Sequence, residues 1–164
     1  MTEGTCQPVS VSRTIEAPAE TLFDVLARPA NHPLIDGSGM LGEASDGVIS
    51  GVGDVFTMTM HNDEMGDYEM ANHVIEYEPG RRIGWEPVLK AASRPEDQAD
   101  IGDRTEPHRW SFEFTPVGPA STLVTETYDC TRAPDWLRKA DKGGTRWIAS
   151  MTATLEKLDA LSRS

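Results

Sequence analysis

The chain has 164 residues, with 27 acidic against 15 basic side chains and a formal net charge of −12 at pH 7. This length suits one domain with a single core, and we expect residues 1–164 to form it. The acidic balance argues against nucleic acid and anionic membrane surfaces as partners, because both attract clustered Lys and Arg. No stretch approaches the ~20 apolar residues of a membrane span, so membrane insertion is not expected.

The first residues, MTEGTCQPVS, lack the basic and apolar regions of a signal peptide, which predicts a cytoplasmic protein. The two cysteines, Cys6 and Cys130, have no His or Cys at a metal-ligand spacing. In a reducing compartment we expect both to be free thiols. The four histidines form neither H-x-x-x-H nor H-E-x-x-H, so the sequence predicts no metal site and no cofactor.

The N-terminal part predicts a strand followed by short helices. A β-friendly run over residues 9–15 ends before Ala17-Pro18, where proline suits the first position of a helix. Residues 30–34 then have room for only a turn or two of helix, and I-D-G-S-G over residues 35–39 predicts a turn. The first helix should end at Pro29 and carry an apolar stripe made of Leu22, Phe23, Val25 and Leu26.

From Gly53 onward the hydrophobic period changes from 3.6 to 2, which indicates strands. The alternation predicts an antiparallel hairpin over residues 56–74 with its turn at 61–67. Further strands are expected around Trp85 and over residues 108–114 and 122–129. The polar, acidic residues 90–104 predict a long loop, with a lid as the alternative.

The C-terminal part predicts a long amphipathic helix. Pro134-Asp135 restart helical structure and Gly143-Gly144 interrupt it. A helix with one apolar side and a sheet with one apolar face bury each other by packing together, which predicts a two-layer α+β fold. From Thr145 to about Leu161 the apolar stripe recurs at spacings of three and four residues: Ile148, Met151, Leu155 and Leu158.

The chain resembles the START/Bet v 1-like superfamily, and within it the SRPBCC polyketide cyclase/dehydrase-like group. The likeness lies in V-x-R-x-I-x-A-P-A-E-x-L-F-D-V-L-A from Val11 to Ala27, in the I-D-G-S-G turn, and in the spacing of the remaining elements. It implies a helix-grip fold, a seven-stranded antiparallel sheet wrapped around the long C-terminal helix, with two short helices after strand 1 and a hydrophobic cavity. To reach this strand count, residues 42–50 must supply one weak strand. The superfamily hosts lipid carriers, hormone receptors, cyclases and chaperone activators, so the motif indicates the fold far more than the function.

The inward-facing side chains of the predicted strands are unusually rich in methionine and aromatic residues. Methionine adapts to irregular gaps and to differently shaped neighbours, which suits a ligand cavity, although an ordinary core is the alternative. The candidate ligand-binding residues are Phe23, Asp36, Ser38, Met58, Met60, Tyr68, Met70, Asn72, Trp85, His108, Trp110, Phe112 and Met151.

Glu126 is the candidate catalytic carboxylate, because strand alternation places it inward between Val124 and Tyr128. A carboxyl in apolar surroundings has its pKa raised and can act as a general acid or base, with Tyr128 or Asn72 orienting a substrate oxygen. The alternatives are a Glu paired with an Arg or one at the open rim of the sheet. His108 is the only histidine expected near the cavity, as a ligand contact or a structural imidazole.

The stretch from Gly37 to Gly42 matches the dinucleotide fingerprint G-x-G-x-x-G letter for letter. That mechanism needs a strand before the glycines and a helix after them, whereas here a helical turn precedes and no helical period follows. We therefore expect no nucleotide site. Asp36 and Ser38 would either hydrogen-bond a ligand at the cavity mouth or cap the loop.

Three functions fit these observations. The first is binding of a small hydrophobic or amphipathic ligand, such as a lipid, a polyketide or another aromatic or isoprenoid-like molecule. The second is a cofactor-independent polyketide cyclase or dehydratase, and the third is a chaperone-activator-like interaction module. A deep cavity would support the first, inward titratable groups the second, and a collapsed core with an exposed apolar patch the third. Assembly as a homodimer is left open.

Overall fold

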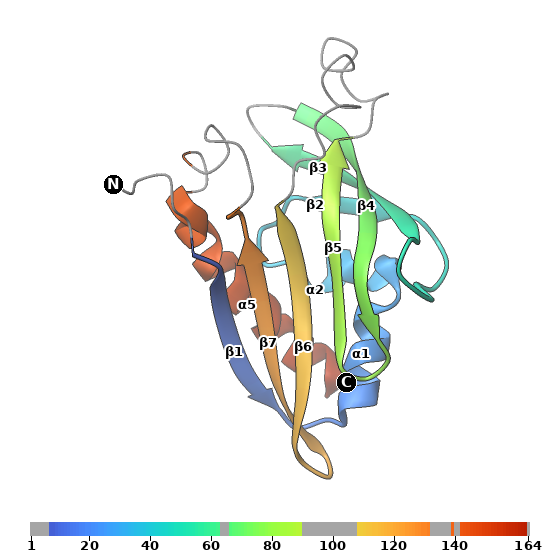
Figure 1. Cartoon of the computed structure of the whole chain (residues 1–164), viewed down its shortest axis with the longest axis vertical. Coiled ribbons are helices and arrows are strands. Elements are labelled where there is room, and N and C mark those ends of the chain that lie inside the picture. Colours follow the sequence, from blue (N-terminus) through green and yellow to red (C-terminus); the bar gives the residue numbers. More distant parts are fainter. Residues whose placement is uncertain (1–6, 63–65, 90–107, 132–138, 140–141, 164) are drawn as a thin grey trace.

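The computed structural model describes residues 7–62, 66–89, 108–131, 139 and 142–163. Its strands form one seven-stranded antiparallel sheet, with short helices after the first strand and a long C-terminal helix behind the sheet in the view of Figure 1. The predicted α+β helix-grip fold is therefore confirmed.

The sheet has the order β1-β7-β6-β5-β4-β3-β2, with antiparallel pairing throughout. The weak strand expected within residues 42–50 is the short β2, which pairs irregularly with β3. β3 and β4 extend further into the predicted turn than expected, and residues 63–65 lie outside the described part. The strands are β1 (Val9–Ile15), β2 (Leu41–Ala44), β3 (Val55–Asn62), β4 (Gly66–Glu78), β5 (Arg82–Leu89), β6 (Arg109–Gly118) and β7 (Ser121–Asp129).

The sheet bends at β-bulges, where one strand has an extra residue opposite its neighbour. In β4, the longest strand, the register with β5 shifts between Val74 and Glu76. A second shift separates Pro116 and Gly118 where β6 meets β7. Such bulges bend a strand and increase its twist, which helps the sheet to curve around a helix.

Strict alternation of burial is clearest in β7. Thr122, Val124, Glu126 and Tyr128 are buried, while the residues between them are partly exposed. A period of two puts successive side chains on opposite faces, so these four share the inner face, which is the face toward the helices. The phase predicted for this strand from the sequence is correct.

Three short helical segments follow β1: α1 (Ala19–Leu26), the 3-10 helix η1 (Pro29–Asn31) and α2 (His32–Ile35). Pro18 sits at the N-cap of α1, one residue before the first helical position that was predicted for it, and the predicted end before Pro29 is confirmed. The buried side of α1 consists of Leu22, Phe23 and Leu26.

The C-terminal helix α5 (Ile148–Ser162) follows the 3-10 segment η4 (Lys142–Trp147). Gly144 has a φ of 97°, and a Cβ there would lie 3.3 Å from the Tyr128 ring and 3.2 Å from Val9, so the interruption predicted at this glycine pair has a packing reason. The predicted apolar stripe started one turn too early. Ile148 is 41% exposed because it lies at the first position of the helix, whereas Met151 is buried.

A partly buried ion pair holds α5 against the edge strand β1. The carboxylate of Asp159, only 3% exposed, accepts hydrogen bonds from Arg13 Nε of β1 at 2.8 Å and from Arg163 Nε at 2.7 Å. These two guanidinium groups lower the pKa of Asp159. Figure 1 shows the result, with α5 passing behind β1 and β7.

Cys130 at the end of β7 is fully buried and disulfide-bonded, so the expectation of a free thiol was wrong for this residue. Disulfide pairing depends on two chain segments meeting in space, which the spacing of two cysteines does not reveal. Cys6 lies outside the described residues, as do the loop expected at 90–104 and the helical start expected at Pro134-Asp135. In the part of the chain that the structure describes, no helix is long and apolar enough to cross a membrane.

Candidate ligand-binding cavity

A cavity of about 380 Å³ lies between the inner face of the sheet and helices α2 and α5. This volume falls within the range typical of small-molecule sites. Its lining includes all but one of the residues proposed from the sequence: Asp36, Ser38, Met58, Met60, Tyr68, Met70, Asn72, Trp85, His108, Trp110, Phe112, Glu126, Tyr128 and Met151. Alternation along five strands brings these side chains together because the sheet curves around one space.

Phe23 is the exception, and it belongs to the core. Its ring makes edge-on contacts with Tyr77 at a centroid distance of 5.5 Å and with Phe114 at 6.0 Å. It is not among the residues that line the cavity, which Leu26, almost one turn further along α1, does contact. The prediction was therefore wrong for Phe23, because a shared apolar stripe does not tell which end of a helix reaches a cavity.

Glu126 projects from β7 into the cavity and is only 5% exposed. Its Oε1 atom has no hydrogen-bond partner among the described residues. Desolvation raises the pKa of Glu126 well above its usual value, and the negative charge of Asp36 adds to the effect. The carboxyl group is thus biased toward its protonated form, which can donate a hydrogen bond or a proton.

Asp36 caps the loop that follows α2. Its carboxylate accepts hydrogen bonds from the Ser38 backbone N–H at 2.9 Å, the Ser38 hydroxyl at 2.7 Å and the Leu41 backbone N–H at 3.0 Å. Of the two roles left open for Asp36, the structure shows the loop cap. Both residues still line the cavity, to which they contribute a carboxylate and a hydroxyl.

The same loop is pressed against α5, which explains its glycine. A Cβ at Gly37 would collide with the Ser150 carbonyl oxygen, and the Gly37 N–H donates to Thr154 Oγ1 at 3.0 Å. The loop leads into strand β2 at Leu41 instead of a helix, so the G-x-G-x-x-G match does not have the structure of a dinucleotide site.

His32 lines the cavity although only His108 was expected there. Its Nε2–H donates to the Leu26 carbonyl at 2.8 Å, and its ring stacks on Trp85 with centroids 5.1 Å apart. Burial lowers the pKa of His32 to about 4, so the ring is neutral at pH 7. No periodic signal marks His32, because it lies in a helix of only four residues.

Trp147 is a second residue that the sequence analysis missed. Its ring lies 5.7 Å from Trp110 and 6.2 Å from Tyr128, and its Nε1 atom is buried without a hydrogen-bond partner among the described residues. A signal was available, since Trp147 precedes Met151 by four residues and so lies on the same side of the helical turn. Residues of η4 and α5 thus close one side of the cavity.

The described residues contain no group of three or more His, Cys, Asp or Glu side chains that could hold a metal ion. Their polar groups instead stand singly in an apolar lining. Asn72 is buried and its Nδ2 donates to the Phe56 carbonyl at a long 3.4 Å, so that nitrogen is already engaged. The arrangement favours an apolar molecule that is held at a few polar points.

Residues 7–163 match the family model described as polyketide cyclase / dehydrase and lipid transport. The chain belongs to this family. Among curated relatives, the uncharacterised protein Rv0088 of Mycobacterium tuberculosis is 33% identical over 125 residues, 74% of this chain and 48% of that protein. The chain thus spans about half the length of this curated relative.

Solved structures show the same fold as this member of the polyketide cyclase / dehydrase and lipid transport family. Zhui aromatase/cyclase from Streptomyces sp. R1128 aligns with a TM-score of 0.64 at 15% identity, covering 96% of this chain and 93% of that chain. A START superfamily protein from Mycobacterium smegmatis aligns with a TM-score of 0.59 at 14% identity, covering 95% and 97%. At such identities the likeness shows the fold alone.

Proposed function

We propose that this protein binds a small hydrophobic or amphipathic ligand, such as a lipid, a polyketide or another aromatic or isoprenoid-like molecule. The observation that carries the proposal is the cavity of about 380 Å³ enclosed by the sheet, α2 and α5. Family membership supports it, because the family is described by cyclisation, dehydration and lipid transport.

The lining explains how such a ligand would be held. Five methionines share the walls with several aromatic rings: Met40, Met58, Met60, Met70 and Met151. Their unbranched, polarisable side chains adapt to different shapes, and the rings offer large apolar surfaces. Burial of apolar ligand surface therefore supplies the affinity, and the few polar groups fix the orientation.

A cavity-filling variant tests this proposal. Met58→Trp places a larger ring inside the cavity, whereas Val55→Trp adds the same ring on the opposite, exposed face of β3. Titration with an uncharged acyl-dimethylaminonaphthalene dye should show binding by the wild type and Val55→Trp and clearly weaker binding by Met58→Trp. Equal binding by all three proteins would indicate surface adsorption and contradict the proposal. Native mass spectrometry of protein from its own host would identify a co-purified ligand.

A second candidate is a cofactor-independent cyclase or dehydratase, and the buried Glu126, whose raised pKa favours the protonated form, supports it. Such a group can protonate a carbonyl oxygen in an aldol-type ring closure or a departing hydroxyl in loss of water, with Tyr128 beside it orienting the oxygen. The walls would hold a flexible substrate in a reactive fold. Glu126→Gln should then lower turnover about 10²-fold and leave ligand affinity within a few-fold. Undiminished turnover in this variant would remove Glu126 as the acid.

The interaction-module alternative has less support. It would go with a collapsed core, whereas the inner layer here encloses a cavity.

Four other expectations stay predictions: one domain over residues 1–164, no nucleic-acid partner, a cytoplasmic location and a homodimer. The disulfide at Cys130 weakens the reasoning for the location, because such bonds are rare in reducing compartments.

A further inference from the structure

The charged and titratable groups of the cavity are unevenly distributed. Glu126 and Asp36 contribute acidic groups, while the described lining contains no Lys and no Arg. Lys157, the cation recorded next to this loop, donates to the Asp36 backbone carbonyl at 3.0 Å and is exposed. An anionic ligand would therefore lose its hydration beside a negative charge and gain no cation from the described lining, which is strongly unfavourable. The Arg146 guanidinium lies 5.0 Å from the centroid of the Trp147 ring but is not itself one of the lining residues.

Two buried polar atoms of the lining lack hydrogen-bond partners among the described residues: Glu126 Oε1 and Trp147 Nε1. An unsatisfied buried polar atom is costly, and few occur in native proteins. The indole N–H can only donate, so its partner has to be an acceptor such as a carbonyl, ether or hydroxyl oxygen. A protonated carboxyl can both donate and accept, and it too is satisfied by such an oxygen.

The two atoms are arranged along one wall of the cavity. Glu126 and Tyr128 are successive inward residues of β7, roughly 7 Å apart along the strand. The Trp147 ring lies 6.2 Å from the Tyr128 ring, centroid to centroid, and Gly144 of the same segment packs against Tyr128 and its β1 neighbour Val9. The two polar positions are thus separated by a distance on the order of 10 Å, which the Tyr128 and Trp110 rings fill with apolar surface.

We propose that the cavity selects elongated, uncharged ligands that carry two oxygen functions, one accepting the Trp147 indole N–H and the other bonded to the Glu126 carboxyl. Anions of the same size are excluded. The proposal rests on the proposed binding function and names the chemical class of the ligand. It assigns Trp147 and Glu126 as specificity-determining residues at the two ends of one binding site.

The experiment compares three ligands with the same ten-carbon chain length: decanol, decanediol with its hydroxyls at the two ends, and decyl sulfate. Each displaces the uncharged acyl-dimethylaminonaphthalene dye from the wild type. We expect decyl sulfate to bind at least about tenfold more weakly than decanol, because the sulfate finds no cation. Equal affinities of decanol and decyl sulfate would overturn the exclusion of anions.

Two variants test the two-point attachment. Trp147→Phe keeps an aromatic ring and removes the N–H, and Glu126→Met keeps the side-chain length and removes the carboxyl. Decanediol should lose about tenfold in affinity in each variant, whereas decanol, with a single oxygen, should lose affinity in only one. Glu126→Gln should restore most of the decanediol affinity, because an amide also donates and accepts.

The outcomes separate this inference from the function on which it rests. If decanol and decanediol each bind every variant as well as the wild type, the two-point attachment is wrong but the proposal of ligand binding stands. If neither the dye nor any of the three ligands binds the wild type, the proposed function itself fails. The Glu126→Met variant keeps the test decisive even if Trp147→Phe disturbs the packing against Trp110.

Discussion

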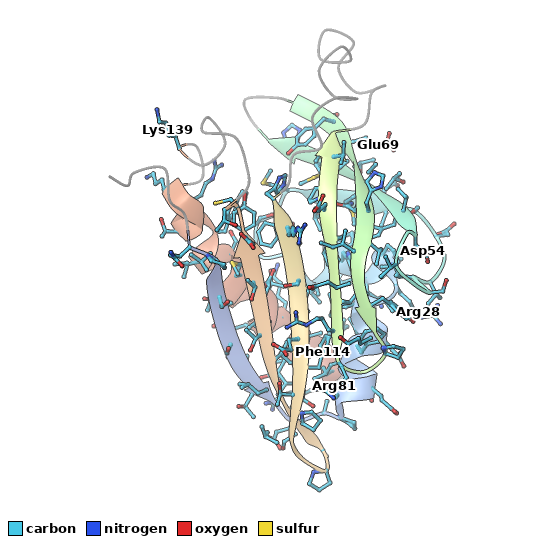
Figure 2. The ribbon with its side chains drawn as sticks, viewed as in Figure 1. Arg28, Asp54, Glu69, Arg81, Phe114 and Lys139 are labelled. Carbon is cyan, nitrogen blue, oxygen red and sulfur yellow. The ribbon has the colours of Figure 1, made fainter. Side chains whose placement is uncertain are left out.

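On the outer face of the sheet, Arg82 lies 3.3 Å from a carboxylate oxygen of Glu76 and 3.3 Å from one of Glu113, and all three side chains are at least one third exposed. On the inner face, Glu126 has no cation among the described residues and is almost fully buried. The outer charged groups lie among water and opposite charges, whereas inside the sheet desolvation favours the neutral form of the Glu126 carboxyl. Figure 2 shows the charged side chains Arg28, Asp54 and Glu69 around the outside of the same fold.

The comparison teaches that one sheet can separate two tasks through strand alternation, with the bulge between Val74 and Glu76 shifting its phase in β4. Adjacent residues on a strand point to opposite faces, so β6 presents Glu113 outward and Phe114 inward. The outer residues contribute solubility and modest pairing. The inner residues decide stability and ligand chemistry, and the following variants test this division from the largest expected effect to the smallest.

Alanine substitutions at two neighbouring residues of β6 should differ most in their effect on the free energy of unfolding. Phe114, labelled in Figure 2, is fully buried, so Phe114→Ala should lower the free energy of unfolding by about 3–5 kcal/mol. Glu113→Ala removes a partly exposed ion pair and should cost about 1 kcal/mol or less. Urea denaturation measures both values. Comparable losses in the two variants would contradict the division between the faces.

His32 should make the wild type sensitive to acid. Its pKa falls from 6.5 to about 4 in the folded state, so the unfolded chain binds the proton first as the pH drops between these values. Stability is therefore lost over this window, by about 3 kcal/mol in total. His32→Gln can still donate to the Leu26 carbonyl but does not titrate. The difference in free energy of unfolding between wild type and variant should shrink as the pH falls, as urea denaturation at several pH values would measure. The same pH dependence in both proteins would contradict the lowered pKa of His32.

Glu126 should act in the opposite direction. Because its pKa is raised, the folded state keeps a proton that the unfolded chain releases above about pH 4.3, so stability falls as the pH rises through that window. The expected slope is about 1.4 kcal/mol per pH unit until the folded carboxyl ionises. Glu126→Gln lacks this slope, and urea midpoints at several pH values measure the difference. A wild type that instead gains stability relative to the variant would show that the carboxyl is paired.

The smallest effect is expected from the outer pair of Arg109 and Glu86, whose Nε and Oε2 atoms lie 2.8 Å apart. Arg109→Gln should cost about 1 kcal/mol or less, and added salt should reduce the difference because the Arg109 side chain is 37% exposed. The control is His32→Gln at neutral pH, whose effect should not depend on salt. A large loss of stability in Arg109→Gln that does not depend on salt would show that this pair behaves like a buried interaction of the inner face.

The sequence by itself determined most of the elements and, away from the bulges, the face on which the strand residues lie. The alternation in β7 predicted the burial of Glu126, and the stripe in α5 predicted that of Leu155 and Leu158. Proline and glycine marked the ends of α1 and the interruption before α5. These features depend on side-chain periodicity and backbone conformation, which are properties of a few neighbouring residues.

Only the tertiary structure decided which buried residues meet at the cavity. It added His32 from a four-residue helix and Trp147 from the segment before α5, moved Phe23 into the core, and bonded Cys130 in a disulfide. Each of these outcomes depends on where segments far apart in the chain come to lie. The local periodicity of the sequence does not predict which of these segments meet, because the curvature of the sheet and the position of α5 decide it.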